Sequence, residues 1–220
     1  IGNTQYAYTT DVTNNNVTRC TLDPTSVFSS CQDAAPGENF DGTPLGMSFI
    51  IANSQLYAYV AVSGGINAGI QQCLVTSGLL SGCTLTGTDI SGNPMSWNPY
   101  DIKIAYSSST TNPTRFAYVA DHDNSTLYKC NISTTGELVS CAATPATSAP
   151  TWMPLQISFG VAKNGSNAQL YAYIADDSRP ASLWQCAMQT TGELDLCSQM
   201  NISGYNMDSF IGTAIGYLSP

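Results

Sequence analysis

An aromatic-Ala-Tyr motif recurs four times along this 220-residue chain and constrains its fold more than any other feature. The copies are Gln5-Tyr-Ala-Tyr8, Leu56-Tyr-Ala-Tyr59, Arg115-Phe-Ala-Tyr118 and Leu170-Tyr-Ala-Tyr173. A period of roughly 50–60 residues is typical of repeat architectures, in which each repeat is one supersecondary unit. The runs around the motif alternate and are rich in β-forming residues, with no helical period. The sequence therefore predicts an all-β protein built from four similar units.

Each repeat also contains two cysteines on either side of a turn. The pairs are Cys20 and Cys31, Cys73 and Cys83, Cys130 and Cys141, and Cys186 and Cys197. Turn residues lie midway in every pair, at 24–26, 77–78, 134–136 and 190–192, so a hairpin folded there sets the cysteines opposite each other. Opposed residues on antiparallel strands have Cβ atoms about 4.5–5.5 Å apart, close to what a disulfide needs. We therefore expect one disulfide within each repeat.

Zinc binding is the alternative use of these cysteines. A zinc site favours close Cys-x2-Cys pairs that converge on one ion, whereas these pairs are widely spaced and the chain has a single histidine, His122. Disulfides persist outside the reducing cytosol, so we expect a secreted or periplasmic protein. Because no basic segment followed by an apolar one opens the chain, we expect Ile1 to be the start of a mature or trimmed chain.

A further strand is expected before the motif in three repeats, at Leu45–Ile51, Asp101–Tyr106 and Leu155–Val161. The chain begins directly with a motif strand and ends with an unpartnered β-type run, Phe210–Tyr217, so its two ends complement each other. A β-propeller closes its ring by such an offset. The sequence predicts one four-bladed β-propeller domain, with repeats at about 1–44, 45–99, 100–154 and 155–207 and a closing strand at 208–220. A two-sheet β-sandwich is the alternative, but it explains neither the repeat nor the offset ends.

Several of these segments resemble the bacterial YVTN, lactonase-like β-propeller repeats. The resemblance rests on Pro44-Leu-Gly-Met47 with Leu56–Ala61, and on Arg115–Asp121 with Gly136-Glu-Leu138, and it extends loosely over all four repeats. It implies a propeller fold and a bacterial source. It also implies a lactonase-like hydrolase as the enzymatic alternative for this chain.

The charge balance excludes several classes of partner. Six Lys and Arg face fifteen Asp and Glu, which gives a net charge of -9. An acidic surface repels phosphate backbones and anionic membranes, so nucleic acid is not an expected partner. No run approaches the roughly 20 apolar residues of a membrane helix, so membrane insertion is not expected.

The sequence lacks the motifs that announce common catalytic sites, such as G-x-S-x-G, H-E-x-x-H or a phosphate-binding glycine loop. A Ser-His-Asp set has one possible centre, His122, which lies in a polar run and is expected to be a solvated loop residue. Glu137 and Glu193 follow the turn in two different repeats and Glu38 lies alone, so no carboxylate pair is expected. We therefore expect no enzymatic activity, no cofactor and no metal site.

Aspartates end the motif strand in three repeats, at Asp11, Asp121 and Asp176, with Val62 in the fourth. An aspartate at such a position usually caps its own turn through an Asx hydrogen bond. The alternative is a ring of carboxylates on one face that binds a cation. Asp121-x-Asp123 and Asp176-Asp177 resemble the start of a calcium loop but lack its glycine and closing glutamate.

An aromatic residue precedes the inner strand in every repeat: Phe40, Trp97, Trp152 and Tyr205. In a propeller these residues share a face with the aspartates, around the mouth of the central channel. Their rings either pack between blades or form a surface that stacks on a sugar or contacts a protein. We predict a secreted, lectin-like binding module that uses these aromatics and aspartates to bind a glycan. A protein-interaction propeller, a structural domain of a larger exported assembly and the hydrolase are the alternatives.

Overall fold

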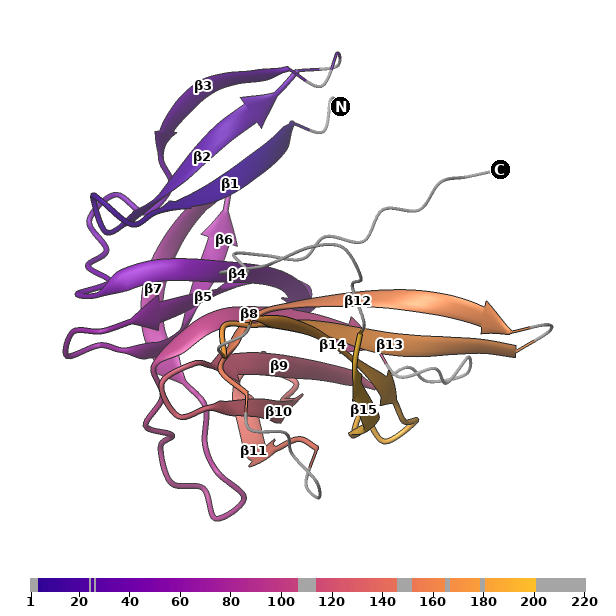
Figure 1. Ribbon diagram of the computed structural model, residues 1–220. Helices are drawn as coiled ribbons and strands as arrows, with labels where there is room; N and C mark the ends of the chain where they lie inside the picture. The colour runs from indigo at the N-terminus through magenta and orange to yellow at the C-terminus, as the bar shows by residue number, and fades with distance from the viewer. Residues whose placement is uncertain are drawn as a thin grey trace.

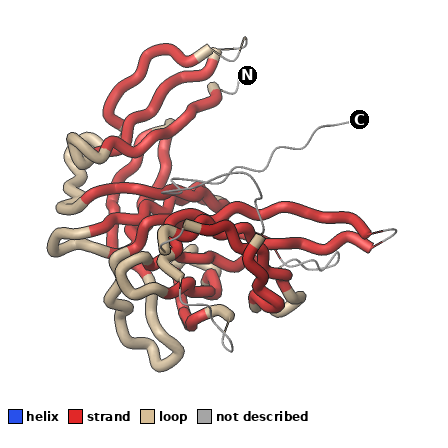
Figure 2. The backbone as a smooth tube through the Cα atoms, in the orientation of Figure 1, coloured by secondary structure: helices blue, strands red, loops and turns tan. Residues whose placement is uncertain are grey.

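The computed structural model describes residues 4–200 except 24, 26, 107–113, 146–151, 165–166 and 179–180; the side chains of 162–164 and 167–168 are also left undescribed. The described residues form strands and no helix, so the all-β prediction is confirmed (Figure 2). Within those ranges, no helix is long and apolar enough to cross a membrane.

The strands form four antiparallel sheets, each made of strands consecutive in the sequence. The first sheet contains β1 (Gln5–Asp11), β2 (Asn16–Leu22) and β3 (Phe28–Asp33). The second contains β4 (Thr43–Ala52), β5 (Gln55–Ser63), β6 (Gly69–Thr76) and β7 (Leu79–Thr86). The third contains β8 (Pro99–Tyr106), β9 (Arg115–Asp121), β10 (Thr126–Ile132) and β11 (Leu138–Ala143). The fourth contains β12 (Pro154–Asn164), β13 (Asn167–Asp176), β14 (Ser182–Met188) and β15 (Leu194–Gln199).

The sheets follow one another in sequence order, as in a β-propeller (Figure 1). Their first strands meet along the inside, with β1 beside β4, β4 beside β8 and β8 beside β12. The first sheet has three strands and the others have four. The strand expected to complete it, within 208–220, lies outside the described residues.

The hydrophobic core consists of three clusters, each between two consecutive sheets. The motif explains this arrangement because successive side chains of a strand point to opposite faces. Ala117 packs against the preceding sheet, whereas Tyr118 packs against the following one. Ala58 and Tyr59 divide in the same way. The two middle motif strands, β5 and β9, are therefore buried on both faces.

All four disulfides expected from the sequence are present: Cys20–Cys31, Cys73–Cys83, Cys130–Cys141 and Cys186–Cys197. Each lies at a β-bulge in the outer hairpin, where the strand register shifts by one residue. The residue before the second cysteine has a positive φ in every sheet: Ser30 (48°), Gly82 (59°), Ser140 (50°) and Leu196 (48°).

A recurring set of contacts, which we call the junction latch, joins each sheet to the next. The second aromatic residue of the motif donates a hydrogen bond from its hydroxyl to the carbonyl oxygen of the turn glycine in the following sheet. The pairs are Tyr8 with Gly78, Tyr59 with Gly136 and Tyr118 with Gly192. The residue before the first cysteine donates to the carbonyl oxygen preceding that glycine: Arg19 to Ser77 at 2.7 Å, Gln72 to Thr135 at 3.2 Å and Lys129 to Thr191 at 3.2 Å.

The first aromatic residue of the motif packs against the same glycine. A Cβ on Gly78, Gly136 or Gly192 would lie 2.7 Å from Tyr6, 3.3 Å from Tyr57 or 2.5 Å from Phe116. These glycines also have φ values of +79°, +87° and +78°, which residues with a Cβ rarely adopt. Both the close approach and the backbone conformation therefore require glycine at the turn.

A leucine two residues after each latch glycine completes the junction. Leu80, Leu138 and Leu194 are 1%, 1% and 2% exposed. Their backbone N–H groups donate to the preceding sheet, at Ala34 O, Thr86 Oγ1 and Thr144 Oγ1.

Candidate functional site

The aromatic residues expected at the channel mouth pack between the sheets. Phe40, Trp97 and Trp152 are 1%, 4% and 1% exposed, and each belongs to the cluster between two consecutive sheets. Trp97 stacks on Tyr128, and Trp152 meets Trp184 edge to face. Of the two arrangements expected for these rings, the structure therefore has packing between sheets, because burying large aromatic rings stabilises the core. Tyr205 lies outside the described residues.

The aspartates at the ends of the motif strands cap their own turns. Asp11 accepts hydrogen bonds from Thr13 N and from the backbone and side chain of Asn14. Asp121 accepts them from Asn124 and, at 3.4 Å, from Asn98 N, so it also fastens the loop that enters β8. Both Asp121 and Asp176 are 0% exposed. These carboxylates do not form a solvent-facing ring, and the described residues contain no group of three or more His, Cys, Asp or Glu able to hold a metal ion.

Asp176 is the most heavily hydrogen-bonded of the three. Its oxygens accept from Met153 N at 2.7 Å, from the hydroxyls of Ser178 and Ser182, and from the indole N–H of Trp184. Burial alone would raise the pKa of Asp176, but these hydrogen bonds lower it below its ordinary value. At Asp121 burial outweighs the hydrogen bonds and raises the pKa.

His122 lies in the turn expected from the sequence, but its side chain is only 13% exposed instead of solvated. The ring packs against Tyr100, with centroids 4.6 Å apart, and Nδ1 lies 3.1 Å from Asp123 Oδ1. Nε2 lies 3.9 Å from Asp177 Oδ2. These contacts are with carboxylates and an aromatic ring, and none places the imidazole against a nucleophilic hydroxyl.

The three glutamates lie apart and have separate roles. Glu193 pairs with Lys129 across the junction of the third and fourth sheets. Glu38 accepts hydrogen bonds from Gly82 N and Cys83 N. Glu137 is exposed, beside a pocket between the second and third sheets.

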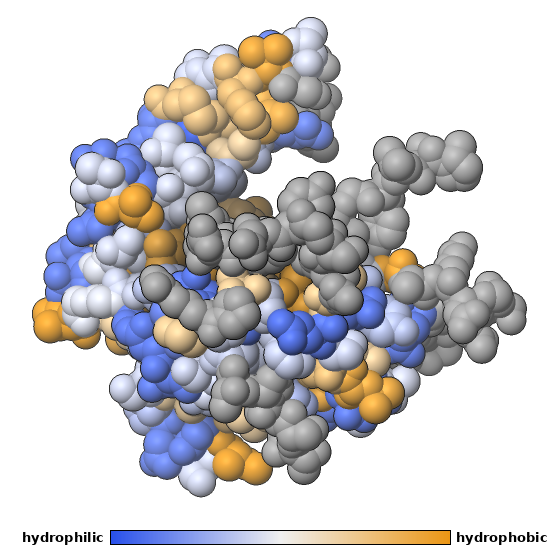
Figure 3. Space-filling view, in the orientation of Figure 1, coloured by the Kyte–Doolittle hydropathy of each residue, from blue (hydrophilic) through white to orange (hydrophobic). Residues whose placement is uncertain are grey.

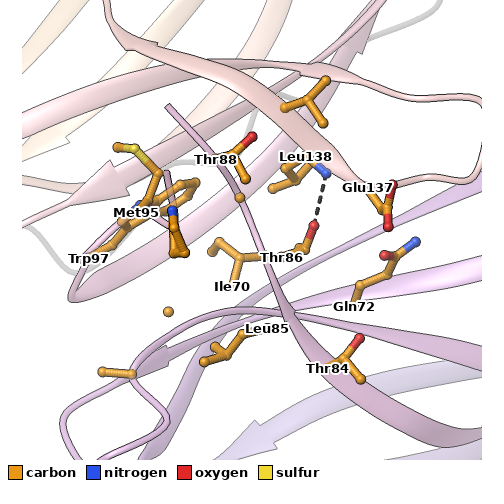
Figure 4. A pocket seen from close by; sticks show the side chains of 15 residues that line it. Ile70, Gln72, Thr84, Leu85, Thr86, Thr88, Met95, Trp97, Glu137 and Leu138 are labelled. Atoms are coloured by element: carbon orange, nitrogen blue, oxygen red, sulfur yellow. Dashed lines mark hydrogen bonds between the residues drawn. The ribbon is translucent and has the colours of Figure 1, made fainter. Parts of the chain in front are cut away.

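This pocket has a volume of about 320 Å³. It is lined by β6 and β7, by the loop that leads toward β8 and by the start of β11. Figure 4 shows Trp97 and Met95 on one side and Gln72 and Glu137 on the other. The volume falls at the lower end of the range of about 300–1,000 Å³ typical of small-molecule sites.

The lining combines apolar surface with hydrogen-bonding groups. Thr84, Thr86 and Thr88 recur at every second residue, so their hydroxyls approach the pocket from one segment. Thr86 Oγ1 accepts from Leu138 N at 2.9 Å and keeps its own proton for donation. The indole N–H of Trp97 is buried and has no hydrogen-bond partner among the described residues. A buried donor without a partner is costly, so an acceptor that reached this group would be stabilised by it.

Among the expected site residues that the structure describes, Trp97 alone is part of this pocket. The alternating threonines were the one sequence signal that could have indicated it. Gln72, Met95 and Glu137 lie on different strands and loops, and only the packing of two sheets brings them together.

No protein-family model matches the sequence, and no curated protein matches it. The resemblance to YVTN repeats therefore gains no support from a family model.

Similar solved structures include an exo-β-1,3-galactanase from Phanerochaete chrysosporium with β-1,3-galactotriose, at 14% identity and a TM-score of 0.58. The match covers 92% of this chain and 48% of that one, so the chain spans about half the length of the fungal enzyme. The same enzyme with galactose has a TM-score of 0.55 at 15% identity, over the same shares of the two chains. A Bifidobacterium bifidum protein assigned as an exo-β-1,3-galactanase matches with a TM-score of 0.57 at 13% identity, over 90% of this chain and 68% of that one. At these identities the likeness concerns the fold alone: the chain has a β-propeller-like fold.

Proposed function

We propose that this chain is a secreted, non-enzymatic carbohydrate-binding module and that a neutral sugar binds in the pocket beside Trp97. The unpartnered indole N–H of Trp97, a residue that lines the pocket, is the observation that carries the proposal. A sugar hydroxyl would accept from this group, and the threonine hydroxyls would donate to and accept from its neighbours. The apolar C–H face of the sugar would rest on Ile70, Leu85 and Met95.

The charge of the site favours a neutral sugar over a sulfated or sialylated one. Glu137 is the one ionisable residue among the described residues that line the pocket, and the chain carries a net charge of -9. An anionic ligand would meet repulsion from both. Galactose and β-1,3-galactotriose, bound by the fungal enzyme of similar fold, are the first ligands to test. The four disulfides support secretion.

The absence of catalysis is part of the proposal. Glycoside hydrolysis usually requires two carboxylates, about 5–5.5 Å apart in retaining enzymes and about 6.5–9.5 Å apart in inverting enzymes. Among the described lining residues Glu137 is the one carboxylate, and Glu193 is paired with Lys129 at another junction. One carboxylate can bind a sugar hydroxyl but cannot supply both members of such a pair.

We also propose that residues 208–220 supply the innermost strand of the first sheet. The three strands of that sheet, against four in each of the others, support this assignment. Replacing Ile211 and Ile215 by proline would then expose the amides of β1 to faster hydrogen exchange, because proline disrupts the strand whose carbonyl oxygens would accept from those amides. Unchanged exchange along β1 would show that another segment covers it.

Replacing Trp97 by phenylalanine tests the binding site. Phenylalanine retains most of the ring packing and removes the N–H, so affinity for the bound sugar should fall about tenfold, as expected for roughly 1.4 kcal/mol. Trp152→Phe is the matched control, because Trp152 occupies the equivalent position at the next junction and lies outside the pocket. Calorimetric titration with galactose and β-1,3-galactotriose measures both variants. Equal affinity in Trp97→Phe and the wild type would exclude the pocket.

Incubation with β-1,3-galactan, and separately with lactones, tests the absence of catalysis. We expect no release of reducing ends and no lactone opening. Turnover that disappears in Glu137→Gln or His122→Ala would establish an enzyme instead.

A further inference from the structure

The fourth sheet has all the side chains of a junction latch, but no hairpin of another described sheet is bound to them. Tyr171, Tyr173 and Gln185 occupy the positions of Phe116, Tyr118 and Lys129 in the third sheet. At the three occupied junctions these donors reach the turn of the next sheet. In the fourth sheet Gln185 Nε2 instead donates to the Tyr173 hydroxyl at 3.0 Å.

Tyr173 is more exposed than two of its three counterparts. Tyr59 and Tyr118 are 0% exposed, whereas Tyr173 is partly buried, as is Tyr8 at the first junction. Tyr171 is partly buried, as are Tyr6 and Tyr57. The flank of the last described sheet therefore presents the same two aromatic rings and side-chain donor that contact a hairpin at the three occupied junctions.

The hairpin of the first sheet is a poor partner for this surface. One backbone hydrogen bond is shared with the third sheet: Asp23 N donates to Val27 O as Ser133 N does to Glu137 O. At the position of the latch glycine, however, the sequence has Ser26. In the other three turns a Cβ at this position would lie 2.5–3.3 Å from the first aromatic residue of the motif, so serine suits a latch poorly.

The residue that follows in this hairpin also departs from the pattern. Phe28 occupies the position of the buried leucine and is 64% exposed, whereas Leu80, Leu138 and Leu194 are 1–2% exposed. Figure 3 shows hydrophobic residues gathered on the first sheet, at the top of the view. The first sheet thus presents an uncovered hairpin that differs in two positions from those that fit a latch.

We propose that the flank formed by Tyr171, Tyr173 and Gln185 binds the outer hairpin of a further repeat of this kind. Its partner is defined by chemistry: a disulfide-closed hairpin with Ser or Thr before a turn glycine and leucine two residues after it. Tyr173 donates to the glycine carbonyl, Gln185 to the carbonyl before it, and the Tyr171 ring packs against the glycine. The structure already contains this contact three times, so the surface needs no rearrangement beyond release of the Gln185–Tyr173 hydrogen bond.

A hairpin attached in cis tests the proposal without depending on a high intrinsic affinity. A copy of Thr126–Ala143, which contains Cys130, Gly136, Leu138 and Cys141, is appended after Pro220 through a long Gly/Ser linker. A second fusion carries Gly136→Ala in the appended copy. We expect the Tm of the fusion with the unchanged hairpin to exceed that of the second fusion by at least about 2–4 °C, the shift that one such hydrogen bond produces in a domain of this size.

The same comparison in a Tyr173→Phe, Gln185→Ala background should lose the difference. Equal Tm values for the two fusions in the wild-type background would overturn the proposal. So would a glycine-dependent shift that survives in the double variant, because the hairpin would then bind elsewhere. If the first sheet itself occupies the flank in solution, Phe28→Asp would lower the Tm of the unfused chain as much as Tyr173→Phe does, and this result also overturns the proposal.

Discussion

Tyr118 and Gly192, 74 residues apart in the sequence, are joined by a hydrogen bond from the tyrosine hydroxyl to the glycine carbonyl oxygen. Burial raises the pKa of Tyr118 far above its ordinary value, and the negative charge of Glu193 raises it further. Tyr59 makes the equivalent hydrogen bond to Gly136, and its pKa is raised mainly by burial. Both hydroxyls therefore remain protonated donors at neutral pH.

Replacing Tyr118 by phenylalanine should lower the free energy of unfolding by about 1–3 kcal/mol, because the buried Gly192 carbonyl loses its partner. Urea titration should show a lower midpoint with an unchanged m value. Tyr173→Phe is the matched control, since its hydroxyl contacts only the side chain of Gln185 within the same sheet among the described residues. Equal losses in the two variants would show that the hydroxyl matters within a sheet and not between sheets.

Replacing Gly192 by alanine should be more costly than the same change at Gly37. Both glycines have positive φ, at +78° and +91°, so both variants carry the backbone penalty. At Gly192 the new Cβ would also lie 2.5 Å from the Phe116 ring, whereas nothing lies within 4 Å at Gly37. We expect Gly192→Ala to lose about 1–3 kcal/mol more than Gly37→Ala in denaturant titrations. A difference near zero would mean that the ring moves aside freely.

Leu196→Gly should stabilise the protein. Leu196 is 76% exposed and has a φ of 48°, a conformation that costs a side chain about 1–2 kcal/mol. Glycine removes this strain at an entropic cost of about 0.5–1 kcal/mol, so a net gain of roughly 0.5–1 kcal/mol is expected. Asp195→Gly, at the neighbouring exposed strand position, should destabilise instead. Thermal melting under oxidising conditions should show a higher Tm for Leu196→Gly and a lower Tm for Asp195→Gly than for the wild type.

The lowered pKa of Asp176 predicts loss of stability in acid. A carboxyl whose pKa is lower in the folded than in the unfolded state stabilises the fold above its unfolded pKa of about 3.9, and that contribution disappears as the pH falls through the folded pKa. Asp176→Asn should lower the free energy of unfolding by about 1–3 kcal/mol at pH 7, with a difference from the wild type that shrinks below about pH 4.

Asp101→Asn is the control for this pH dependence. Burial raises the pKa of Asp101 despite the ammonium group of Lys103. Its effect on the pH dependence of stability is therefore opposite to that of Asp176: ionisation of Asp101 lowers the free energy of unfolding as the pH rises. The loss of stability at low pH should therefore persist in Asp101→Asn. Identical unfolding curves for Asp176→Asn and the wild type from pH 2 to 7 would contradict the assignment.

Short-range patterns in the sequence were sufficient to predict the sheets and the disulfides. Turn residues midway between Cys130 and Cys141 fix a hairpin locally, and the alternation around Tyr118 fixes a strand buried on both faces. Neighbouring residues in the sequence do not determine where the side chain of a loop residue points. Trp97 packs inward because Tyr128 and Gly87 shape its cavity, and Gly87 is so close that a Cβ would lie 2.7 Å from the ring. The junction latch was equally hidden, since its donor and acceptor lie in different repeats.

The location of the disulfides has a consequence for how the chain matures. Every bond joins cysteines 10 or 11 residues apart within one hairpin, and none crosses from one sheet to another. Each can therefore form as soon as its own hairpin emerges during synthesis or export, without waiting for residues that come later. Native pairing at one repeat leaves no cysteine free to mispair with the next. Oxidative maturation of this protein can thus proceed vectorially, one hairpin at a time, with little need for disulfide isomerisation.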